Sequence, residues 1–218
     1  MPDAPTETAR KARQQRKRDR SRDDILAAAR SVLNRDGIAA VTLEAVAREA
    51  GMSKTGLYYY FSSKEALVFE LVFAALRLHA ERVQTAVEAT DTGSAALGAV
   101  IRHTVEAYSS QMDDFRLAFL LSQVTSSTHM QLSGEQLTRI RPLNDMLLAG
   151  ATRLLAEGKS TGQESGRVEP RLLSFLAFLS AIGLLTMKGL VESQGDPLLY
   201  SDDQLIEALS AIFARAAS

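Results

Sequence analysis

The segment that decides the fold runs from Thr42 to Leu67 and has the sequence TLEAVAREAGMSKTGLYYYFSSKEAL. Thr42 is a favourable N-cap, and the apolar side chains that follow it are spaced as one face of a short helix requires. Gly51 predicts a tight turn, because glycine adopts a left-handed backbone at little steric cost. Ser53 can cap a second short helix over residues 54–60. The segment therefore predicts two short helices joined by a turn.

Helices are also predicted on both sides of this pair. Upstream, apolar residues from Ile25 to Leu33 recur at the spacing of one helix face, and Gly37 is a favourable residue for the end of that helix. Downstream, residues 62–65 form a capping box that opens a longer helix, ending at about residue 89. Two short helices joined by a glycine-containing turn, with another helix before them, predict a helix-turn-helix unit.

Three consecutive tyrosines, Tyr58 to Tyr60, stand in the second short helix. One interpretation is that they form a packed aromatic patch. Consecutive helix positions point in different directions, however, so one small core cannot bury all three rings. Lys54 and Thr55 are expected to project outward together with Tyr58 and Tyr59. A face of basic and aromatic side chains on this helix favours contact with DNA.

The composition of the whole chain predicts an all-α fold. The chain contains 32 Ala and 30 Leu against 12 Val and 7 Ile, so good helix formers greatly outnumber β-branched aliphatics. No proline lies between Pro5 and Pro142 to interrupt a helix. The sequence has no cysteine, three scattered histidines and no catalytic motif. We therefore expect no enzyme activity, no metal and no cofactor.

Charge divides the chain into a basic and an acidic part. Residues 1–64 carry 13 Lys/Arg and 8 Asp/Glu, whereas residues 65–218 carry 12 and 18. Eight of the basic side chains lie within the first 22 residues. We expect residues 1–20 to form a flexible basic arm, which is either a solvated tail or a contact for the DNA backbone or minor groove.

The sequence favours a cytoplasmic protein. The longest run free of Asp, Glu, Lys, Arg and His, residues 172–187, has 16 residues, which is short for a membrane span. The basic N-terminus lacks the apolar segment of a secretory signal.

The segment from Thr42 to Leu67 closely resembles the signature of the tetracycline-repressor (TetR) family of bacterial transcriptional regulators, and the resemblance extends over residues 22 to about 70. It implies that the helix over 54–60 enters the major groove of DNA. Lys54, Thr55 and Gly56 would meet base edges, and Tyr58, Tyr59 and Tyr60 would meet phosphates or thymine methyls. Thr42, Ser53 and Lys64 complete the expected DNA-binding set. Some relatives place a base-contacting cation at the position of Glu44. An anion would be repelled there, so Glu44 is left out of the set.

The remaining two-thirds of the chain predicts further helices at about 94–112, 114–127, 136–157, 169–194 and 202–216. The segment from Leu172 to Val191 is apolar on two faces, so both must be buried. We assign one face to the protomer's own core: Leu172, Phe175, Leu176, Leu179 and Ile182. We assign the other, with the last helix, to a dimer interface: Leu173, Ala177, Ala181, Leu184, Leu205, Leu209 and Ile212. This arrangement resembles the four-helix dimer interface of TetR-like proteins.

Apolar bulk with an occasional polar group near the middle of this region predicts a pocket for a small molecule. The candidates are Tyr108, Met112, Phe115, Phe119, Gln123, Met146 and Phe178. Ordinary core packing is the alternative for each of them.

These features together predict a basic arm (1–20), a helix-turn-helix DNA-binding domain (21–67) and a larger helical ligand-binding and dimerisation domain (68–218). The expected function is that of a homodimeric transcriptional repressor, released from a palindromic operator by a small-molecule effector. One alternative is a sequence-tolerant architectural DNA-binding protein whose helical domain only oligomerises. In another, the effector of the acidic domain is a polypeptide.

Overall fold

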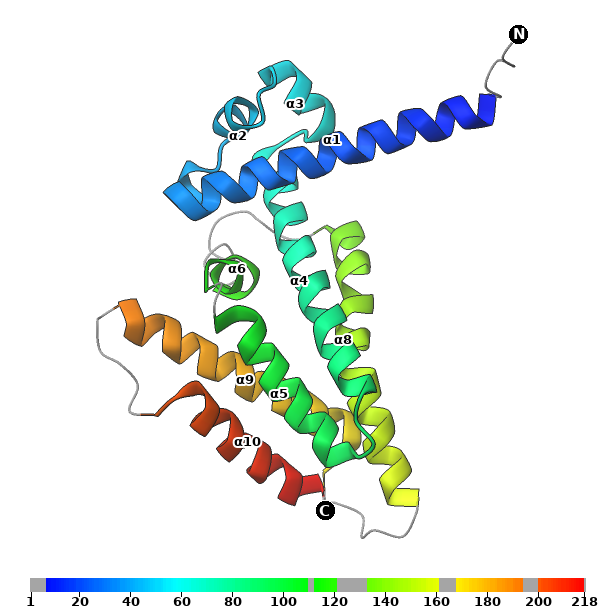
Figure 1. Cartoon of the computed structure of the whole chain (residues 1–218), viewed down its shortest axis with the longest axis vertical. Coiled ribbons are helices and arrows are strands. Elements are labelled where there is room, and N and C mark those ends of the chain that lie inside the picture. Colours follow the sequence, from blue (N-terminus) through cyan, green and yellow to red (C-terminus); the bar gives the residue numbers. More distant parts are fainter. Residues whose placement is uncertain (1–6, 110–111, 121–132, 161–167, 194–199, 218) are drawn as a thin grey trace. The chain divides into compact units, whose positions relative to one another are not determined.

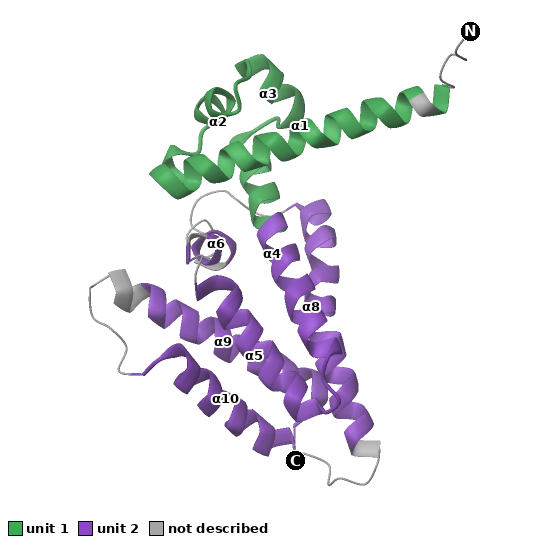
Figure 2. Cartoon of the chain, viewed as in Figure 1, with its two compact units in different colours: residues 1–73 green, residues 74–218 purple. Residues whose placement is uncertain are grey.

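The computed structural model describes residues 7–109, 112–120, 133–160, 168–193 and 200–217, and every element within these ranges is helical. The chain forms two compact units, residues 1–73 and 74–218 (Figure 2). Helix α4 (Lys64–Glu88) begins in the first unit and continues into the second. The observed fold is the expected all-α one.

The first unit is built from α1 (Glu7–Asp36), the 3-10 turn η1 (Ile38–Ala40), α2 (Leu43–Glu49), α3 (Lys54–Tyr60) and the start of α4 (Figure 1). Its core is formed by buried apolar side chains from each of these helices: Ile25, Ala29, Val32, Val46, Leu57, Phe61 and Leu67. Apart from Leu67, these are positions at which the periodicity of the sequence predicts buried faces.

Side-chain caps delimit the helix-turn-helix. Thr42 Oγ1 accepts a hydrogen bond of 3.1 Å from the backbone N–H of Ala45, and Ser53 Oγ accepts one of 3.1 Å from Gly56. Gly51 has φ +64° in the turn between α2 and α3, a conformation that side chains with a Cβ rarely adopt. The predicted caps and turn of the motif are confirmed.

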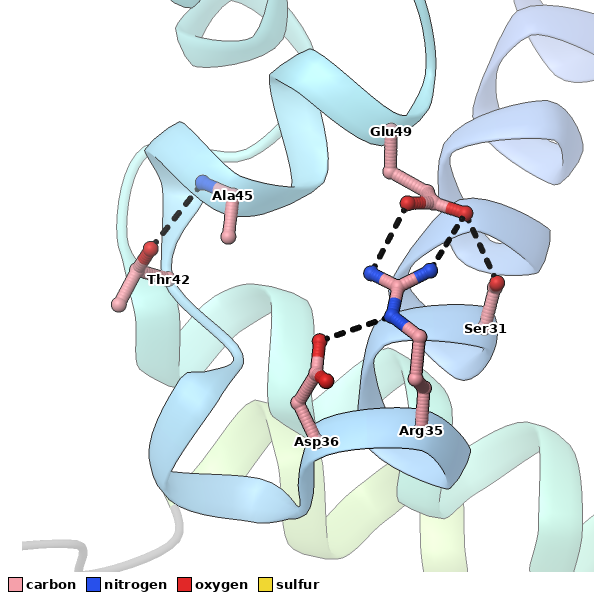
Figure 3. A network of polar contacts seen from close by, with 6 residues as sticks. All are labelled: Ser31, Arg35, Asp36, Thr42, Ala45 and Glu49. Carbon is pink, nitrogen blue, oxygen red and sulfur yellow. Dashed lines mark hydrogen bonds and ion pairs between the residues drawn. The ribbon is translucent and has the colours of Figure 1, made fainter.

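An ion-pair network joins the end of α1 to α2 (Figure 3). The guanidinium of Arg35 donates to both carboxylate oxygens of Glu49, at 3.1 and 3.3 Å, and to Asp36 at 3.0 Å. Ser31 donates to the same Glu49 carboxylate at 2.8 Å. These bonds from Arg35 and Ser31 lower the pKa of Glu49. A two-point contact of this kind restricts how α2 lies on α1.

Helix α1 begins at Glu7, about eighteen residues before the helix that the apolar periodicity predicts. Ala, Arg, Gln and Lys in this extension are good helix formers, and the packed part of α1 supplies the nucleus from which it propagates. Lys11 pairs with Glu7 at 2.8 Å, and Gln15 donates to Asp19 at 2.8 Å, each across one helical turn. The expectation of a flexible arm is therefore corrected for residues 7–20.

The second unit contains the rest of α4, α5 (Gly93–Ser109), α6 (Met112–Phe115), the π-helical segment η2 (Arg116–Leu120), α8 (Gly134–Ser160), α9 (Pro170–Ser193) and α10 (Asp202–Ala217). Helix α5 packs against α8, α9 and α10 (Figure 1). A Cβ on Gly93 would lie 2.9 Å from the Cα of Leu155, so a glycine is needed where α5 meets α8. Of the helix predicted over 114–127, residues 121–127 lie outside the described residues.

The predicted assignment of the two apolar faces of α9 is wrong for all of its residues except Ile182, which packs partly buried against the protomer's own core as expected. Leu173, Ala177, Ala181 and Leu185 lie in the protomer's own core, together with Ile206 and Phe213 of α10. Leu184 and Leu209 are partly buried against the same core, and Leu205 is also partly buried. The exposed side chains are those expected inside, Leu172, Phe175, Leu176 and Leu179. Alanines on the inner face allow α9 to approach its own neighbours closely, which explains why small residues line it.

Helix α9 also contains one stretch, Pro170–Gly189, that is long and apolar enough to cross a membrane by length and composition. The stretch extends past Arg171 and Lys188, which bound the shorter uncharged run. One side of this helix packs in the core of the second unit, and the other carries exposed apolar side chains.

Candidate nucleic-acid interface

Helix α3 turns one side into the core and the other toward solvent. Leu57 is fully buried, whereas Tyr58 and Tyr59 are 45% and 66% exposed. Lys54 and Thr55 are exposed as well. Aromatic rings this accessible on a short helix leave apolar surface and hydroxyl groups available for a partner.

The other residues of the expected DNA-binding set lie around this surface. Ser53 is exposed, and Gly56 and Tyr60 are half-buried in α3. Thr42 and Lys64 are half-buried at the starts of α2 and α4. The hydroxyls of Thr42 and Ser53 already accept backbone hydrogen bonds as caps, so each has only its proton and one remaining lone pair for a further contact.

A groove lies between α3 and the N-terminal extension of α1. It has a volume of about 500 Å³ and is lined by Lys11, Gln14, Gln15, Lys17, Arg18, Tyr59 and Tyr60. The guanidinium of Arg18 lies over the ring of Tyr59, 5.4 Å from its centre. Periodicity could not reveal this groove, because the extension has no apolar face to mark it as a helix.

Glu44, which is not among the expected DNA-binding residues, is exposed next to Lys54 of α3. Its carboxylate forms an ion pair with the ammonium of Lys54. This hydrogen bond lowers the pKa of Glu44 and raises that of Lys54. The ammonium also lies 5.9 Å from the ring centre of Tyr58. No spacing rule links residues ten apart across a turn, so only the fold brings this pair together.

In the second unit, three of the expected pocket residues, Tyr108, Phe115 and Phe178, form an aromatic cluster with His79. The ring of His79 lies 5.0 Å from that of Tyr108 and 6.1 Å from that of Phe178, and Tyr108 lies 5.7 Å from Phe115. Tyr108 and Phe115 are buried in the core, whereas Phe178 is half-buried. Met112 and Met146 are half-buried. The side chain of Phe119 and the whole of Gln123 lie outside the described residues.

Among the described side chains of this expected set, Phe178 alone lines the groove between α8 and α9, which has a volume of about 450 Å³. Its walls are mainly apolar: Leu147, Leu148, Leu172, Phe175 and Phe178. The polar residues along it are Asn144, Glu169 and Arg171, and Arg171 forms an ion pair of 2.8 Å with Asp145. An apolar groove with a few polar groups has the character of a small-molecule site. Within the described ranges, no cluster of three His, Cys, Asp or Glu side chains could hold a metal.

The buried state of His79 predicts a pH-dependent stability. Burial, helped by Arg82, lowers the pKa of His79 from 6.5 to about 4, and its Nε2 shares a hydrogen bond of 3.1 Å with Thr104. As the pH falls, the imidazole of His79 takes up a proton in the unfolded chain before it does so in the folded one. The stabilisation by neutral, buried His79 is therefore fully present above pH 6.5 and declines as the pH falls toward 4. We expect urea titrations to lose about 2 kcal/mol of unfolding free energy between about pH 7 and pH 5.

The control for this prediction is His79→Gln, which keeps a hydrogen-bonding group and does not titrate. Over the same pH interval, its unfolding free energy should change by about 2 kcal/mol less than that of the wild type. Parallel pH profiles for the two proteins would show that other groups account for the dependence.

Capped helices, the Gly51 turn and an outward-facing α3 define this protein as a helix-turn-helix DNA-binding protein with a second helical unit. Residues 25–71 match the family model described as bacterial regulatory proteins, tetR family. This match identifies residues 25–71 as a TetR-type DNA-binding domain.

Solved structures share the fold over most of the chain. A TetR/AcrR-family regulator from Thermobifida fusca is 23% identical, with a TM-score of 0.69 and coverage of 90% of this chain and 97% of that one. The regulator FadR from Bacillus subtilis, solved with stearoyl-CoA, is 19% identical, with a TM-score of 0.63 and coverage of 88% and 97%. AibR, solved with isovaleryl coenzyme A and operator DNA, is 20% identical, with a TM-score of 0.62 and the same coverage. No curated protein matches the chain by sequence.

Proposed function

We propose that the protein is a homodimeric, effector-responsive repressor that binds a palindromic operator in the cytoplasm. The observation that carries the proposal is the outward face of α3, where Lys54, Thr55, Tyr58 and Tyr59 are exposed beside a buried Leu57. The first unit would bind DNA, and the second would bind the effector and the partner subunit.

The exposed face of α3 divides into two kinds of contact. Lys54 and Thr55, in its first turn, would meet base edges in the major groove, with Gly56 letting the backbone approach. The phenolic groups of Tyr58, Tyr59 and Tyr60 would meet phosphates or thymine methyls. Lys64, Thr42 and Ser53 would add backbone contacts at the neighbouring helix starts.

Because residues 7–20 are helical, we expect them to contact phosphates and not to enter the minor groove. An α-helix with its side chains is about 10–12 Å wide, whereas the minor groove of B-DNA is about 6 Å wide. A helical extension therefore does not fit where an extended arm does. Lys11, Lys17 and Arg18 line the groove beside Tyr59, where they would hold the DNA backbone.

Replacing Lys11, Lys17 and Arg18 together by Gln should therefore reduce the slope of log affinity against log salt. Each cation that neutralises a phosphate contributes about 0.9 to that slope, so we expect a decrease of about two to three units. The core of the first unit should be unaffected, since these side chains are exposed, although the variant loses the Lys11–Glu7 pair and the contact of Arg18 with Tyr59. The matched control replaces Arg13, Arg16 and Arg20, which do not line the groove. Equal decreases in both triple variants would mean that the extension acts only through its total charge.

The exposed face of α9 is the proposed dimer interface. Leu172, Phe175, Leu176 and Leu179 are each at least 40% exposed, and Met187 extends the same helix side. Leu172 and Phe175 also line the groove between α8 and α9, so that groove would open at the edge of the interface. Ile212 of α10 is 62% exposed. A contiguous apolar surface on adjacent helices is typical of a subunit interface, and a two-fold axis would pair it with itself. Two identical DNA-binding units related by such an axis call for a palindromic operator.

The groove between α8 and α9 is the proposed effector site. Its apolar walls suit an acyl or similar hydrocarbon group, and Arg171 at its polar side suits an anion. Two structural neighbours were solved with acyl-coenzyme A molecules, so acyl thioesters are the first effectors to test. An effector that binds one state of the dimer more tightly would shift the population away from the operator-binding state.

Selection from a randomised pool of double-stranded DNA, followed by affinity measurements, tests this function. A regulator should enrich a palindrome and prefer it over random DNA by at least about a thousandfold. Stearoyl-CoA and isovaleryl-CoA are then added to the complex, and release of the DNA would identify an effector class. Tight binding without sequence preference would instead support an architectural protein that coats DNA.

A further inference from the structure

The fold joins an acidic and a basic residue at the surface that faces DNA in the proposed function. Glu44 stands in the first turn of α2 and Lys54 in the first turn of α3, and the two side chains form an ion pair. Both remain accessible, with 58% and 54% of their side-chain surface exposed. The pair is therefore a surface feature with free hydrogen-bonding capacity, and no core contact requires its presence.

A carboxylate at this surface needs a partner whenever DNA is bound. The phosphates of DNA repel an unpaired Glu44, and Lys54 cannot leave Glu44 for a phosphate without creating that repulsion. The carboxylate of Glu44 accepts from Lys54 and from its own backbone N–H, and because a carboxylate has about four acceptor sites it can accept a further hydrogen bond while the pair stays together. In the major groove, the only donors on base edges are N4 of cytosine and N6 of adenine.

The ammonium of Lys54 narrows this choice to one base pair. Lysine has three donors, so one can serve Glu44 while the other two meet neighbouring acceptors. A G·C pair presents O6 and N7 of guanine side by side, with N4 of cytosine next to O6. In an A·T pair the donor N6 lies between the two acceptors, and the thymine methyl occupies the outer edge.

We propose that Glu44 and Lys54 act as one recognition unit for a G·C base pair in each half-site. Lys54 donates to O6 and N7 of guanine, and Glu44 accepts from N4 of cytosine while it keeps its bond to Lys54. Glu44 also limits binding to random DNA, because the paired ammonium is not available to neutralise a phosphate. This inference rests on the proposed function and specifies which base pair the site selects.

The test compares the full-length protein with Glu44→Gln, Lys54→Met and the double variant, each in selection from the same randomised double-stranded DNA. The wild type should enrich a motif with a G·C pair at one position of each half-site. Both single variants should lose preference at that same position, by about 5- to 150-fold, the range for one base-reading contact. The double variant should lose no more than the larger single loss, because the two residues act together.

The salt slope of binding to random DNA gives a second measurement, because it reports whether Lys54 becomes free to neutralise a phosphate. Glu44→Gln should bind random DNA more tightly, and its salt slope should steepen by about 0.9, because Lys54 becomes free to contact a phosphate. The matched control is Glu81→Gln, which breaks the exposed pair between Arg77 and Glu81 in the second unit. That variant should leave both the motif and the salt slope unchanged.

Several outcomes would overturn the inference while leaving the proposed function intact. These are an A·T pair at the affected position, different positions affected by the two single variants, or no change of the motif in either. A wild-type protein that binds DNA but enriches no motif would instead refute the proposed repressor function, and the recognition unit with it.

Discussion

The double variant Leu176→Glu, Leu179→Glu is expected to be a folded monomer that binds the operator only weakly. The two leucines are 40% and 43% exposed on the outer face of α9, so the protomer accommodates carboxylates there without burying them. In the proposed dimer the carboxylates would be buried in a patch that repeats the same charges from the partner subunit, and burying unpaired charge costs several kcal/mol. Loss of the linked second DNA-binding unit should weaken operator binding by about a hundredfold or more.

Sedimentation equilibrium measures the mass, and circular dichroism measures the helix content of the same sample. The control is Leu137→Glu, which places one carboxylate at a leucine of α8 that is 42% exposed. It should remain dimeric. If the α9 double variant also remains dimeric with full operator affinity, the interface lies elsewhere on the second unit.

The double variant Ala177→Glu, Ala181→Glu should unfold instead of forming a folded monomer, although these residues lie on the same helix. Both alanines are completely buried against α5 and α10 neighbours such as Ile101 and Ile206. Two glutamates would overfill this core and place carboxylates where no partner is available among the described contacts. The expected cost of several kcal/mol is a large part of the roughly 5–15 kcal/mol that stabilises a domain. The second unit should therefore unfold.

Urea unfolding and circular dichroism distinguish this result from simple dissociation. The variant should lose helix content and cooperativity, whereas the Leu176/Leu179 variant should keep both. A stable, fully helical monomer from the alanine variant would mean that this face is a subunit interface after all.

The helix-turn-helix could be predicted almost completely from the sequence because its determinants are local. Thr42 and Ser53 cap helices through bonds to backbone groups three residues away, and Gly51 is needed for its own backbone conformation. The spacing that places Leu57 in the core is a property of one helix. Such local signals do not depend on tertiary contacts with the rest of the chain.

The helical extension of α1 shows where local signals become insufficient. Residues 7–20 have no apolar periodicity, so the sequence indicates charge and solvation but no packed helix. Continuity with the packed part of α1, and pairs such as Glu7 with Lys11, account for the helical state.

The sequence by itself determined that this chain is all-helical, that its N-terminal part carries a TetR-type helix-turn-helix, and that α9 has two apolar faces. Only the tertiary structure decided which of those faces is internal, because hydrophobic burial is non-directional and either face could satisfy it. The choice depends on α5 and α10, whose side chains fit around Ala177 and Ala181. The same reason applies to Glu44 and Lys54: their charges are evident in the sequence, but only the turn between α2 and α3 makes them neighbours.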